Sequence, residues 1–389
     1  VGVQNPDLEV FDIVMATEFG TSYNSYIVKG EDKTALVETS HADFFDEYKS
    51  NITSVTDPAK IDYIIVNHTE PDHSGALAAL TELCPKAQIL ATAVGANYLK
   101  NITNRSDLGV RPVKDGEELD LGGVTLKFVV APLLHWPDSM MTYCKEEKAL
   151  FSCDFLGAHY SFAPMIDTEL KDTEGYRRAF KEYFDAIFGP FKPFVVAGLA
   201  KISALDIEYV CNSHGPVLTS AGQLGYAVAE YGKMSRIVKN DPKKIPVFYC
   251  SAYGCTAALA EKIREGVLSV LPTAECKTYD IIKHDLSVLA AQLNSSNAFA
   301  IGSPTLNADA VPPVWDLIAS VDAINIKKRP AAVFGSYGWS GEAVPAIVAR
   351  LTALKLNVVG EGLKACFVPG DADLSKAFEL GALLAQSIA

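Results

Sequence analysis

The sequence lacks the features of membrane and nucleic-acid-binding proteins. It has no apolar run of about 18 residues that could cross a bilayer, and no signal peptide of charged and then apolar residues at its start. Basic clusters are also absent, and 47 Asp and Glu residues outnumber 34 Lys and Arg residues, which gives a net charge of -13. Nucleic-acid binding depends on basic side chains that neutralise phosphates. We therefore expect a cytoplasmic protein with no membrane span and no nucleic-acid partner.

Paired cysteines are missing as well. None of the eight cysteines belongs to a Cys-x-x-Cys pair, which excludes zinc ribbons and rubredoxin-type iron sites. Most of them lie in apolar contexts, such as Cys250 at the end of a Val-Phe-Tyr run, where a reduced, buried thiol is expected. We assign chemistry to none of these cysteines.

The length of the chain predicts two domains. At roughly 150 residues per domain, 389 residues exceed one ordinary core. A Lys-rich stretch at 233–244 contains Pro242 and is followed by Pro246, and each proline would stop a helix. We therefore expect a first domain at residues 1–240 and a second at 245–389. The start at Val1 without Met, and the end within an expected helix at 374–389, suggest a processed or excised part of a longer protein.

The two domains differ in the pattern of their apolar runs. In the first, short strands alternate with turns and helices, which predicts two sheets with helices packed outside. The strands expected there are 24–28, 34–38, 63–66, 88–91 and 124–130, and the helices are 74–83 and 176–188. The second domain has buried strands at 246–250, 298–301 and 331–334, and helices at 257–268, 314–320 and 342–354. This strict alternation predicts βαβ units in a doubly wound parallel sheet.

A dense cluster of possible metal ligands lies in the first domain. The segment His68-Thr-Glu70-Pro-Asp72-His73 sits between a predicted strand and a predicted helix, so one turn carries four imidazole or carboxylate groups of the kind that iron, manganese and zinc accept. Three more candidates follow the ends of expected strands, namely His135, Asp154 and His214. Any one of these histidines alone would equally fit a buried or turn residue. The density of the cluster favours a metal site.

Together, these seven residues provide enough ligands for two metal ions, with one carboxylate bridging them. Glu70, Asp72 and Asp154 carry three negative charges against the four positive charges of two divalent ions, so little net charge is buried. His159, five residues after Asp154, is a candidate to orient the ligands or to donate protons.

A phosphate-binding turn opens the second domain. The expected strand is followed by Ser251, Ala252, Tyr253, Gly254, Cys255 and Thr256, and then by a helix. Such a turn offers free backbone N–H groups and the positive end of the helix dipole to a phosphate. Neither the GxGxxG pattern of dinucleotide sites nor a Gly-Lys-Ser/Thr phosphate loop is present, so NAD and ATP are disfavoured and FMN is favoured.

Two further loops follow the next buried strands, and all three loops should converge at the carboxyl ends of the parallel strands. Their candidate FMN-binding residues are Ser303, Pro304, Thr305, Leu306, Asn307, Ser336, Tyr337, Gly338, Trp339, Ser340 and Gly341. We expect Tyr337 and Trp339 to lie against the flavin ring, while the glycines let the backbone approach its polar edge.

These motifs resemble those of the flavodiiron proteins, or A-type flavoproteins, over essentially the whole chain. The metal cluster is similar to that of the metallo-β-lactamase fold, whose zinc hydrolases carry HxHxDH, whereas Glu70 here replaces the second histidine. The second and third loops resemble those of the family's flavodoxin domain, and Cys255 stands where simple flavodoxins favour Asn. The resemblance implies an αββα metallo-β-lactamase-like sandwich followed by a doubly wound flavodoxin-like domain.

The resemblance also implies how the cofactors are held and what they do. One iron ion would bind His68, Glu70 and His135, the other would bind Asp72, His73 and His214, and Asp154 would bridge the two. The ions would share an oxo or hydroxo bridge and receive electrons from FMN. The implied reaction is the reduction of O2 to water or of NO to N2O.

The implied partners are a gas, an electron donor and a second copy of the chain. The donor would be rubredoxin, coenzyme F420, or NAD(P)H acting through a flavin reductase module, and the assembly would be a head-to-tail homodimer or a higher oligomer. The sequence of the first loop, Tyr253-Gly-Cys-Thr256, is similar to that of photosynthetic members of the family. The chain would then be the core of such a member without its flavin reductase domain.

Two other functions remain open from the sequence. A dizinc hydrolase that uses a metal-bound hydroxide would explain the first domain and leave the second without a role. A non-catalytic, FMN-binding electron carrier or regulatory subunit would leave the seven metal ligands without a role.

Overall fold

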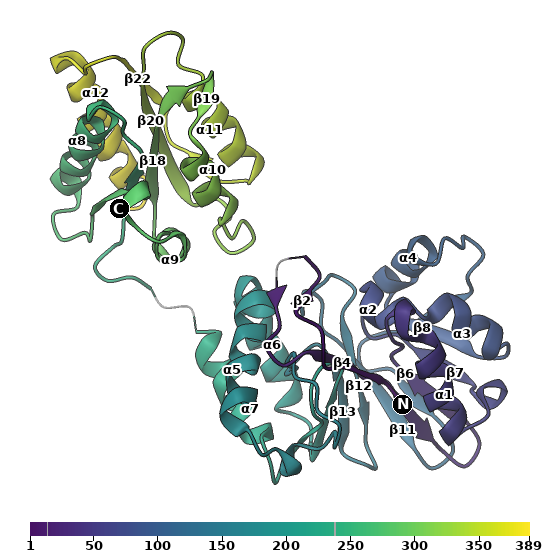
Figure 1. Ribbon diagram of the computed structural model, residues 1–389. Helices are drawn as coiled ribbons and strands as arrows, with labels where there is room; N and C mark the ends of the chain where they lie inside the picture. The colour runs from purple at the N-terminus through teal and green to yellow at the C-terminus, as the bar shows by residue number, and fades with distance from the viewer. Residues whose placement is uncertain (14, 237–238) are drawn as a thin grey trace. The chain divides into compact units, whose positions relative to one another are not determined.

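The computed structural model describes residues 1–13, 15–236 and 239–389. The chain divides into two compact units, Val1–Ile237 and Val238–Ala389 (Figure 1). Each unit has its own buried core. Within the described ranges, no helix is both long enough and apolar enough to cross a lipid bilayer.

The first unit contains two sheets that pack face to face. The first sheet runs in the order β5 (Tyr26–Lys29), β6 (Thr34–Val37), β7 (Tyr63–Ile65), β8 (Gln88–Ala91) and β9 (Val110–Pro112). The second runs in the order β10 (Glu118–Asp120), β11 (Thr125–Val130), β12 (Met140–Cys144), β13 (Ala149–Cys153), β14 (Tyr209–Asn212) and β15 (Leu218–Thr219). Val37, Leu90, Phe128 and Met140 belong to one buried cluster, so the apolar faces of the two sheets cover each other.

Helices cover the outer face of each sheet (Figure 1). On the first sheet these are α1 (Phe45–Val55), α3 (Leu77–Leu83) and α4 (Ala93–Ile102), and on the second α5 (Thr173–Tyr183), α6 (Lys192–Ile202) and α7 (Leu224–Met234). Two short strand pairs complete the unit, namely β1 (Val3–Asn5) with β4 (Thr21–Tyr23), and β2 (Val10–Phe11) with β3 (Met15–Ala16). The αββα layering confirms the predicted metallo-β-lactamase-like sandwich.

Some predicted elements of this unit are placed differently in the structure. The helix expected at 74–83 is two helices, because α2 (Pro71–Ser74) begins earlier, with Pro71 in its first turn, and the chain continues through Gly75 into α3. The strand expected before His135 is absent, because β11 ends at Val130 and turns follow. The helix expected to reach residue 188 ends as α5 at Tyr183 and continues as one wider π-helical turn.

The second unit is built on one parallel sheet. Its strands lie in the order β17 (Thr278–Asp280), β16 (Val247–Tyr249), β18 (Phe299–Leu306), β20 (Pro330–Tyr337) and β21 (Asn357–Val358), with β22 (Leu363–Cys366) also paired to β20. A short strand, β19 (Asp309–Ala310), turns back antiparallel to β18. Counted along the chain, the parallel strands have the order 2-1-3-4-5, which is that of flavodoxin.

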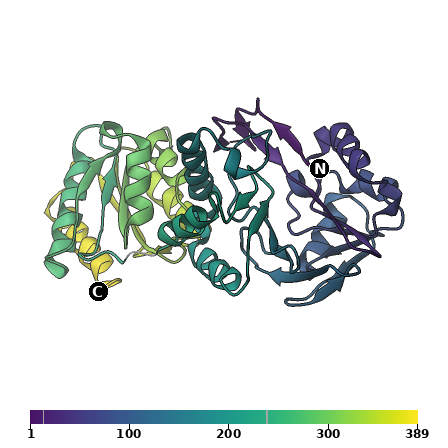
Figure 2. The ribbon, with the colours of Figure 1, turned by 90° about the horizontal axis from the view of Figure 1, so that it is seen from below.

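Both faces of this sheet are covered by helices, as the second view also shows (Figure 2). One face carries α9 (Leu286–Ser295), α10 (Pro312–Ala319) and α11 (Ala343–Ala353), and the other carries α8 (Cys255–Val270) and α12 (Asp371–Gln386). Neighbouring strand residues alternate between the two cores. Val333 packs into the first core and Phe334 into the second. The predicted doubly wound, flavodoxin-like domain is confirmed.

Candidate functional site

The seven predicted metal ligands come together at one edge of the αββα sandwich. They lie just beyond the ends of strands, where the parallel strands β6, β7 and β8 share a carboxyl edge and β13 runs parallel to β14. The loop after β7 and α2 supply His68, Glu70, Asp72 and His73, while His135, Asp154 and His214 follow β11, β13 and β14. Their ligand atoms form two sets, each within 4.8 Å. We call His68, Glu70 and His135 the Glu70 group, and Asp72, His73 and His214 the Asp72 group.

In the Glu70 group, one carboxylate oxygen faces two imidazoles. Oε2 of Glu70 lies 3.2 Å from Nε2 of His68 and 3.1 Å from Nε2 of His135. Oδ2 of Asp154 lies 3.6 Å and 3.4 Å from the same two nitrogens. Two imidazoles and two carboxylates therefore point at one small volume.

The Asp72 group repeats this arrangement on the other side of Asp154. Oδ2 of Asp72 lies 3.2 Å from Nε2 of His73 and 3.1 Å from Nε2 of His214. Oδ1 of Asp154 lies 3.0 Å and 3.4 Å from these nitrogens. The two oxygens of the Asp154 carboxylate thus face different groups, which is the geometry of a bridging ligand.

The chemistry of these side chains fits a pair of cations. Asp154, Asp72 and His73 are buried, and Oδ1 of Asp72 and Oδ2 of Asp154 have no hydrogen-bond partner among the described residues. Buried carboxylate oxygens without a partner are costly unless a cation or a donor satisfies them. The set of imidazole nitrogens and carboxylate oxygens suits a first-row transition metal such as iron.

Electrostatics hold protons on these imidazoles when no metal is bound. Burial opposes charge on His68, but Asp138 and Glu70 outweigh it and raise its pKa from 6.5 to about 10. Burial also opposes charge on His214, but Asp154 and Asp72 raise its pKa to about 9. Burial raises the pKa of Glu70, yet His135 and His68 overcome this and lower it to about 2. Metal ions must therefore displace protons from this site.

The outward ring nitrogens of two ligands are held by the surrounding protein. Nδ1 of His68 lies 3.3 Å from Oδ2 of Asp138, which also accepts the backbone N–H of Thr69 at 2.8 Å. Nδ1 of His214 donates to the backbone oxygen of Ser22 at 2.6 Å. A proton on each Nδ1 leaves Nε2 free to bind a metal. Asp138 was not predicted from the sequence, although it stands only three residues after His135.

His159 lies beside the site and outside both groups. Its Nδ1 is 2.8 Å from Oγ1 of Thr21, and that hydroxyl is 3.3 Å from Nδ1 of His214. Its Nε2 is buried and has no partner in the part of the chain that the structure describes. Burial, together with the nearby His214, holds the pKa of His159 well below its usual range. Thr21 was not predicted from the sequence, and we find no local signal for it.

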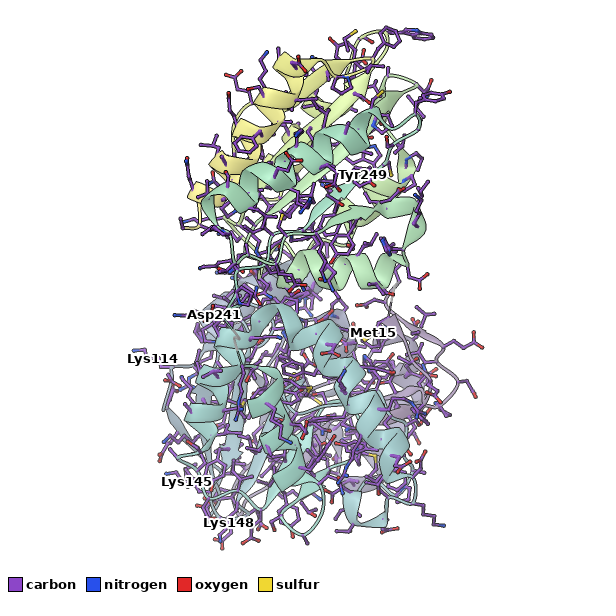
Figure 3. All side chains as sticks on the ribbon, turned by 90° about the vertical axis from the view of Figure 1, so that its left-hand side faces the viewer. Met15, Lys114, Lys145, Lys148, Asp241 and Tyr249 are labelled. Atoms are coloured by element: carbon purple, nitrogen blue, oxygen red, sulfur yellow. The ribbon has the colours of Figure 1, made fainter. Side chains whose placement is uncertain are left out.

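Tyr183 is a second buried neighbour that the sequence did not reveal. Its hydroxyl donates to Oδ1 of Asp154 at 3.0 Å. Tyr183 also lines a small cavity with His159, Glu182 and Met15, and Met15 is labelled in Figure 3. His159 and Tyr183, which both lie next to predicted ligands, thus share one small cavity of about 10 Å³.

In the second unit, the three predicted loops enclose a cavity of about 430 Å³ at the carboxyl edge of the sheet. Tyr249, labelled in Figure 3, is the last residue of the strand that leads into the first loop. The predicted residues that line the cavity are Ala252, Tyr253, Cys255, Pro304, Thr305, Leu306, Asn307, Ser336, Tyr337, Gly338, Trp339 and Ser340. Ala308 and Phe367 also line it and were not predicted. Trp339 is 99% exposed, so its ring is available to a ligand.

The remaining predicted residues shape the loops and do not line the cavity. Gly254 caps α8 with a φ of 82°, a left-handed conformation that favours glycine. The buried hydroxyl of Thr256 lies 2.8 Å from that of Ser336 and so ties the first loop to the third. Ser251 accepts the backbone N–H of Ala257 and Ser303 accepts that of Val311, each within its own segment, and Gly341 has a φ of 85°.

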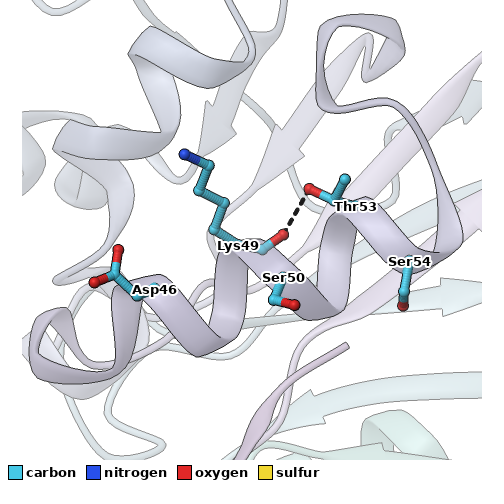
Figure 4. Close-up of a pocket in the computed structure, with 5 residues that line it drawn as sticks. All are labelled: Asp46, Lys49, Ser50, Thr53 and Ser54. Carbon is cyan, nitrogen blue, oxygen red and sulfur yellow. Dashed lines mark hydrogen bonds between the residues drawn. The ribbon is translucent and has the colours of Figure 1, made fainter.

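Another hollow lies on the exposed surface of α1 (Figure 4). Its lining includes Asp46, Lys49 and Ser50, and the hydroxyl of Thr53 donates to the backbone oxygen of Lys49 at 2.8 Å. These residues all come from one helix and do not converge on a common point. We therefore assign no function to this hollow.

An αββα sandwich with a buried histidine and carboxylate cluster, followed by a flavodoxin-like sheet, defines the class of proteins that combine a metallo-β-lactamase-like domain with a flavodoxin-like domain. Family models agree with this division, since residues 21–215 match the ODP family beta lactamase model and residues 247–381 match the flavodoxin model.

Known relatives extend over the whole chain. The flavo-diiron protein FprA2 of Clostridium acetobutylicum is 50% identical over 389 residues, which cover 100% of this chain and 97% of the relative. The anaerobic nitric oxide reductase flavorubredoxin of Aeromonas hydrophila is 33% identical, over 95% of this chain and 74% of the relative. The structure of rubredoxin oxygen:oxidoreductase from Desulfovibrio gigas matches with a TM-score of 0.69 and 28% identity, over 100% of this chain and 96% of that one. The chain belongs to the flavodiiron protein family, and it is an oxidoreductase.

Proposed function

We propose that the Glu70 group and the Asp72 group each hold one iron ion and that Asp154 bridges the two ions. The main observation behind this proposal is that the two oxygens of the Asp154 carboxylate face different groups. Oδ2 faces the Glu70 group and Oδ1 faces the Asp72 group. When bound there, iron would supply the redox chemistry that the reduction of a small gas requires. The protein's own contribution is to fix the ligands in a buried, charge-compensated site.

We propose that FMN binds in the cavity of the second unit. Support comes from the first loop, which ends at the N-terminus of α8 and presents backbone N–H groups to a phosphate. Tyr337 and Trp339 line the cavity and offer aromatic faces to the flavin ring. We retain all seventeen predicted loop residues as the binding segment, because those that do not line the cavity hold the loops together. The chemistry that FMN supplies is the transfer of one or two electrons.

We propose that the reaction is the reduction of O2 to water, of NO to N2O, or of both. The names of two relatives support this, one being an oxygen:oxidoreductase and the other a nitric oxide reductase. His159 is the proposed proton donor or ligand-orienting residue, because its Nε2 has no partner and Thr21 connects its other nitrogen to His214. Both reactions consume protons, and because its lowered pKa keeps His159 neutral, its imidazole would pass a proton on by taking one up at one ring nitrogen and releasing one from the other.

We further propose that electrons come from an external donor, which is rubredoxin, coenzyme F420 or a flavin reductase module using NAD(P)H. The proposed assembly is a head-to-tail homodimer or higher oligomer in the cytoplasm, with domain limits at 1–240 and 245–389. The relation to photosynthetic members stays a prediction. The dizinc hydrolase and the non-catalytic carrier are not favoured, because the relatives are flavodiiron proteins and a nitric oxide reductase.

Gas uptake by the purified protein tests the proposed function. The protein is loaded anaerobically with ferrous iron and FMN, reduced chemically, and mixed with O2 or NO in an electrode chamber. We expect uptake of at least one gas only when both cofactors are present. Ester hydrolysis by zinc-loaded protein, with no gas uptake by the iron form, would support the hydrolase instead.

A further inference from the structure

Glu38 is a buried carboxylate that the proposed metal site does not use. It follows β6 directly, is 1% exposed, and has a φ of 62°, which is unusual for a residue with a side chain. Its backbone is held by three contacts, because its N–H donates to the oxygen of Ile65 at 2.8 Å and its oxygen accepts the hydroxyls of Ser25 at 2.9 Å and Tyr48 at 3.3 Å. The fold therefore maintains this residue in a strained conformation at a fixed place.

The carboxylate of Glu38 lies behind His73. Oxygen, nitrogen and sulfur atoms of Glu38, His73 and Cys153 lie within 4.8 Å of one another, and Nδ1 of His73 is 3.7 Å from the sulfur of Cys153. Nε2 of His73 is on the other side of the ring, 3.0 Å from Asp154. Nδ1 of His73 thus faces Cys153, and the Glu38 carboxylate lies close to the ring, although no hydrogen bond or ion pair joins these two described residues in the metal-free structure.

Glu38 has a carboxylate oxygen that needs a hydrogen-bond donor, and His73 has a ring nitrogen that needs an acceptor. Oε1 of Glu38 accepts the backbone N–H of Asn67 at 2.9 Å, while Oε2 is buried with no hydrogen-bond partner within residues 1–13, 15–236 and 239–389. If His73 binds a metal through Nε2, its proton must sit on Nδ1, where it needs an acceptor. A thiol at 3.7 Å is a weak acceptor, whereas a carboxylate oxygen is a strong one.

In the Glu70 group, a contact of this kind between an outer carboxylate and a histidine ring is already formed. There, Asp138 faces Nδ1 of His68 and also accepts the backbone N–H of Thr69. Asn67 and Thr69 flank His68, so the two backbone N–H groups on either side of one ligand each hold a buried carboxylate. The Glu70 group and the Asp72 group therefore each have one further carboxylate close to the ring of one of their histidines.

We propose that Glu38 is a positioning residue that accepts the Nδ1 proton of His73 and thereby keeps Nε2 directed at the second metal ion. This inference rests on the proposed two-iron function and extends it, because it makes His73 dependent on a side chain 35 positions earlier. Without Glu38, the ring of His73 is free to hold its proton on Nε2 or to turn away. The ion of the Asp72 group is then lost more easily than the ion of the Glu70 group.

The test measures the affinity for ferrous iron site by site. Metal-free protein is titrated anaerobically with Fe²⁺, and bound iron is counted by equilibrium dialysis. Glu38→Gln preserves size but has only one acceptor oxygen, which cannot serve both Asn67 and His73. We expect one ion to bind with unchanged affinity and the other about tenfold to hundredfold more weakly. Asp138→Asn should weaken one site as well, and Cys153→Ala should leave both affinities unchanged.

Mössbauer spectra of ⁵⁷Fe-loaded protein give a second readout that a loss of fold alone would not produce. At limiting iron, the Glu38→Gln and Asp138→Asn variants should each retain a single iron signal, and the two signals should differ. If Glu38→Gln does not fold, the iron affinities of Glu38→Asn are measured in its place, because Asn tolerates the left-handed backbone and is too short to reach His73. Unchanged affinity for both ions in the variant that folds overturns the role of Glu38. Failure of the unaltered protein to bind two ions overturns the proposed function itself.

Discussion

Oδ1 of Asp154 lies 3.0 Å from Nε2 of His73, while the other oxygen of the same carboxylate faces the Glu70 group. Both proposed ion sites therefore depend on one side chain. We predict that Asp154→Asn loses more than half of the bound iron, because an amide offers one weak oxygen ligand where the carboxylate offers two charged ones. Metal analysis after anaerobic loading checks this. Asp62→Asn is the matched control, since Asp62 pairs with Lys33 and Lys86 outside the metal site and its loss should leave iron content unchanged.

Metal binding should release protons. In the metal-free protein, burial opposes charge on His68 and His214, but nearby carboxylates raise their pKa values from 6.5 to about 10 and about 9. Because these folded-state pKa values lie above the unfolded ones, the charged pairs stabilise the protein fully below about pH 6.5, and this stabilisation is lost as the pH rises through 9 to 10. Metal ions must displace these protons, so the apparent iron affinity should fall as the pH is lowered below about 9.

Two measurements check the proton release. Isothermal titration calorimetry at pH 7, in buffers of different ionisation enthalpy, should show protons leaving as Fe²⁺ binds. The melting temperature of the metal-free protein should also fall between pH 7 and 10, while that of the loaded protein changes less. Loading without proton release would contradict the charged state of the metal-free site.

Tyr183 should stabilise the metal-free protein through its hydroxyl. That group donates to Asp154 at 3.0 Å in a buried position. We predict that Tyr183→Phe lowers the free energy of unfolding by about 2 kcal/mol, the usual contribution of a hydrogen bond to a charged group. Tyr176→Phe is the matched control, because the buried hydroxyl of Tyr176 has no partner and its removal should be neutral or stabilising. Urea denaturation measures both, and equal effects would argue against a role for the Asp154 contact.

Trp339 should contribute to flavin binding and not to folding. Its side chain is 99% exposed and lines the cavity, so Trp339→Ala removes an aromatic face without opening the core. We predict a loss of FMN affinity of up to about tenfold, which corresponds to one aromatic stacking contact. Quenching of FMN fluorescence on titration measures it. Ile282→Ala, at a 63% exposed position outside the cavity lining, should bind FMN normally.

The local pattern of the sequence was enough to predict both folds and the seven proposed ligands. Four of these residues, namely His68, Glu70, Asp72 and His73, lie within six positions of the chain. The other three each follow a strand, and the segments after those strands lie at the same edge of the sandwich. The turn before His135 was wrongly predicted as a strand, because the apolar run of Pro-Leu-Leu fits a strand equally well. Apolar runs of this length do not distinguish a buried turn from a strand.

The residues that support the ligands could not be predicted in the same way. Glu38 and Thr21 precede the ligand cluster by tens of residues, and nothing next to them in sequence marks a metal site. Glu38 comes close to the cluster because it follows β6, which pairs with β7, whereas Thr21, the first residue of β4, meets His159 and His214 only through tertiary packing. Tyr183 reaches Asp154 from a helix whose other residues form an ordinary aromatic core. Such contacts depend on tertiary packing, which local periodicity does not encode.

Anomalous X-ray scattering at the iron edge, from crystals of the anaerobically loaded protein, tests the central claim most directly. Our account predicts two iron peaks, one beside the Glu70 group and one beside the Asp72 group, with the carboxylate of Asp154 between them. A single peak, or iron bound away from Asp154, would contradict it.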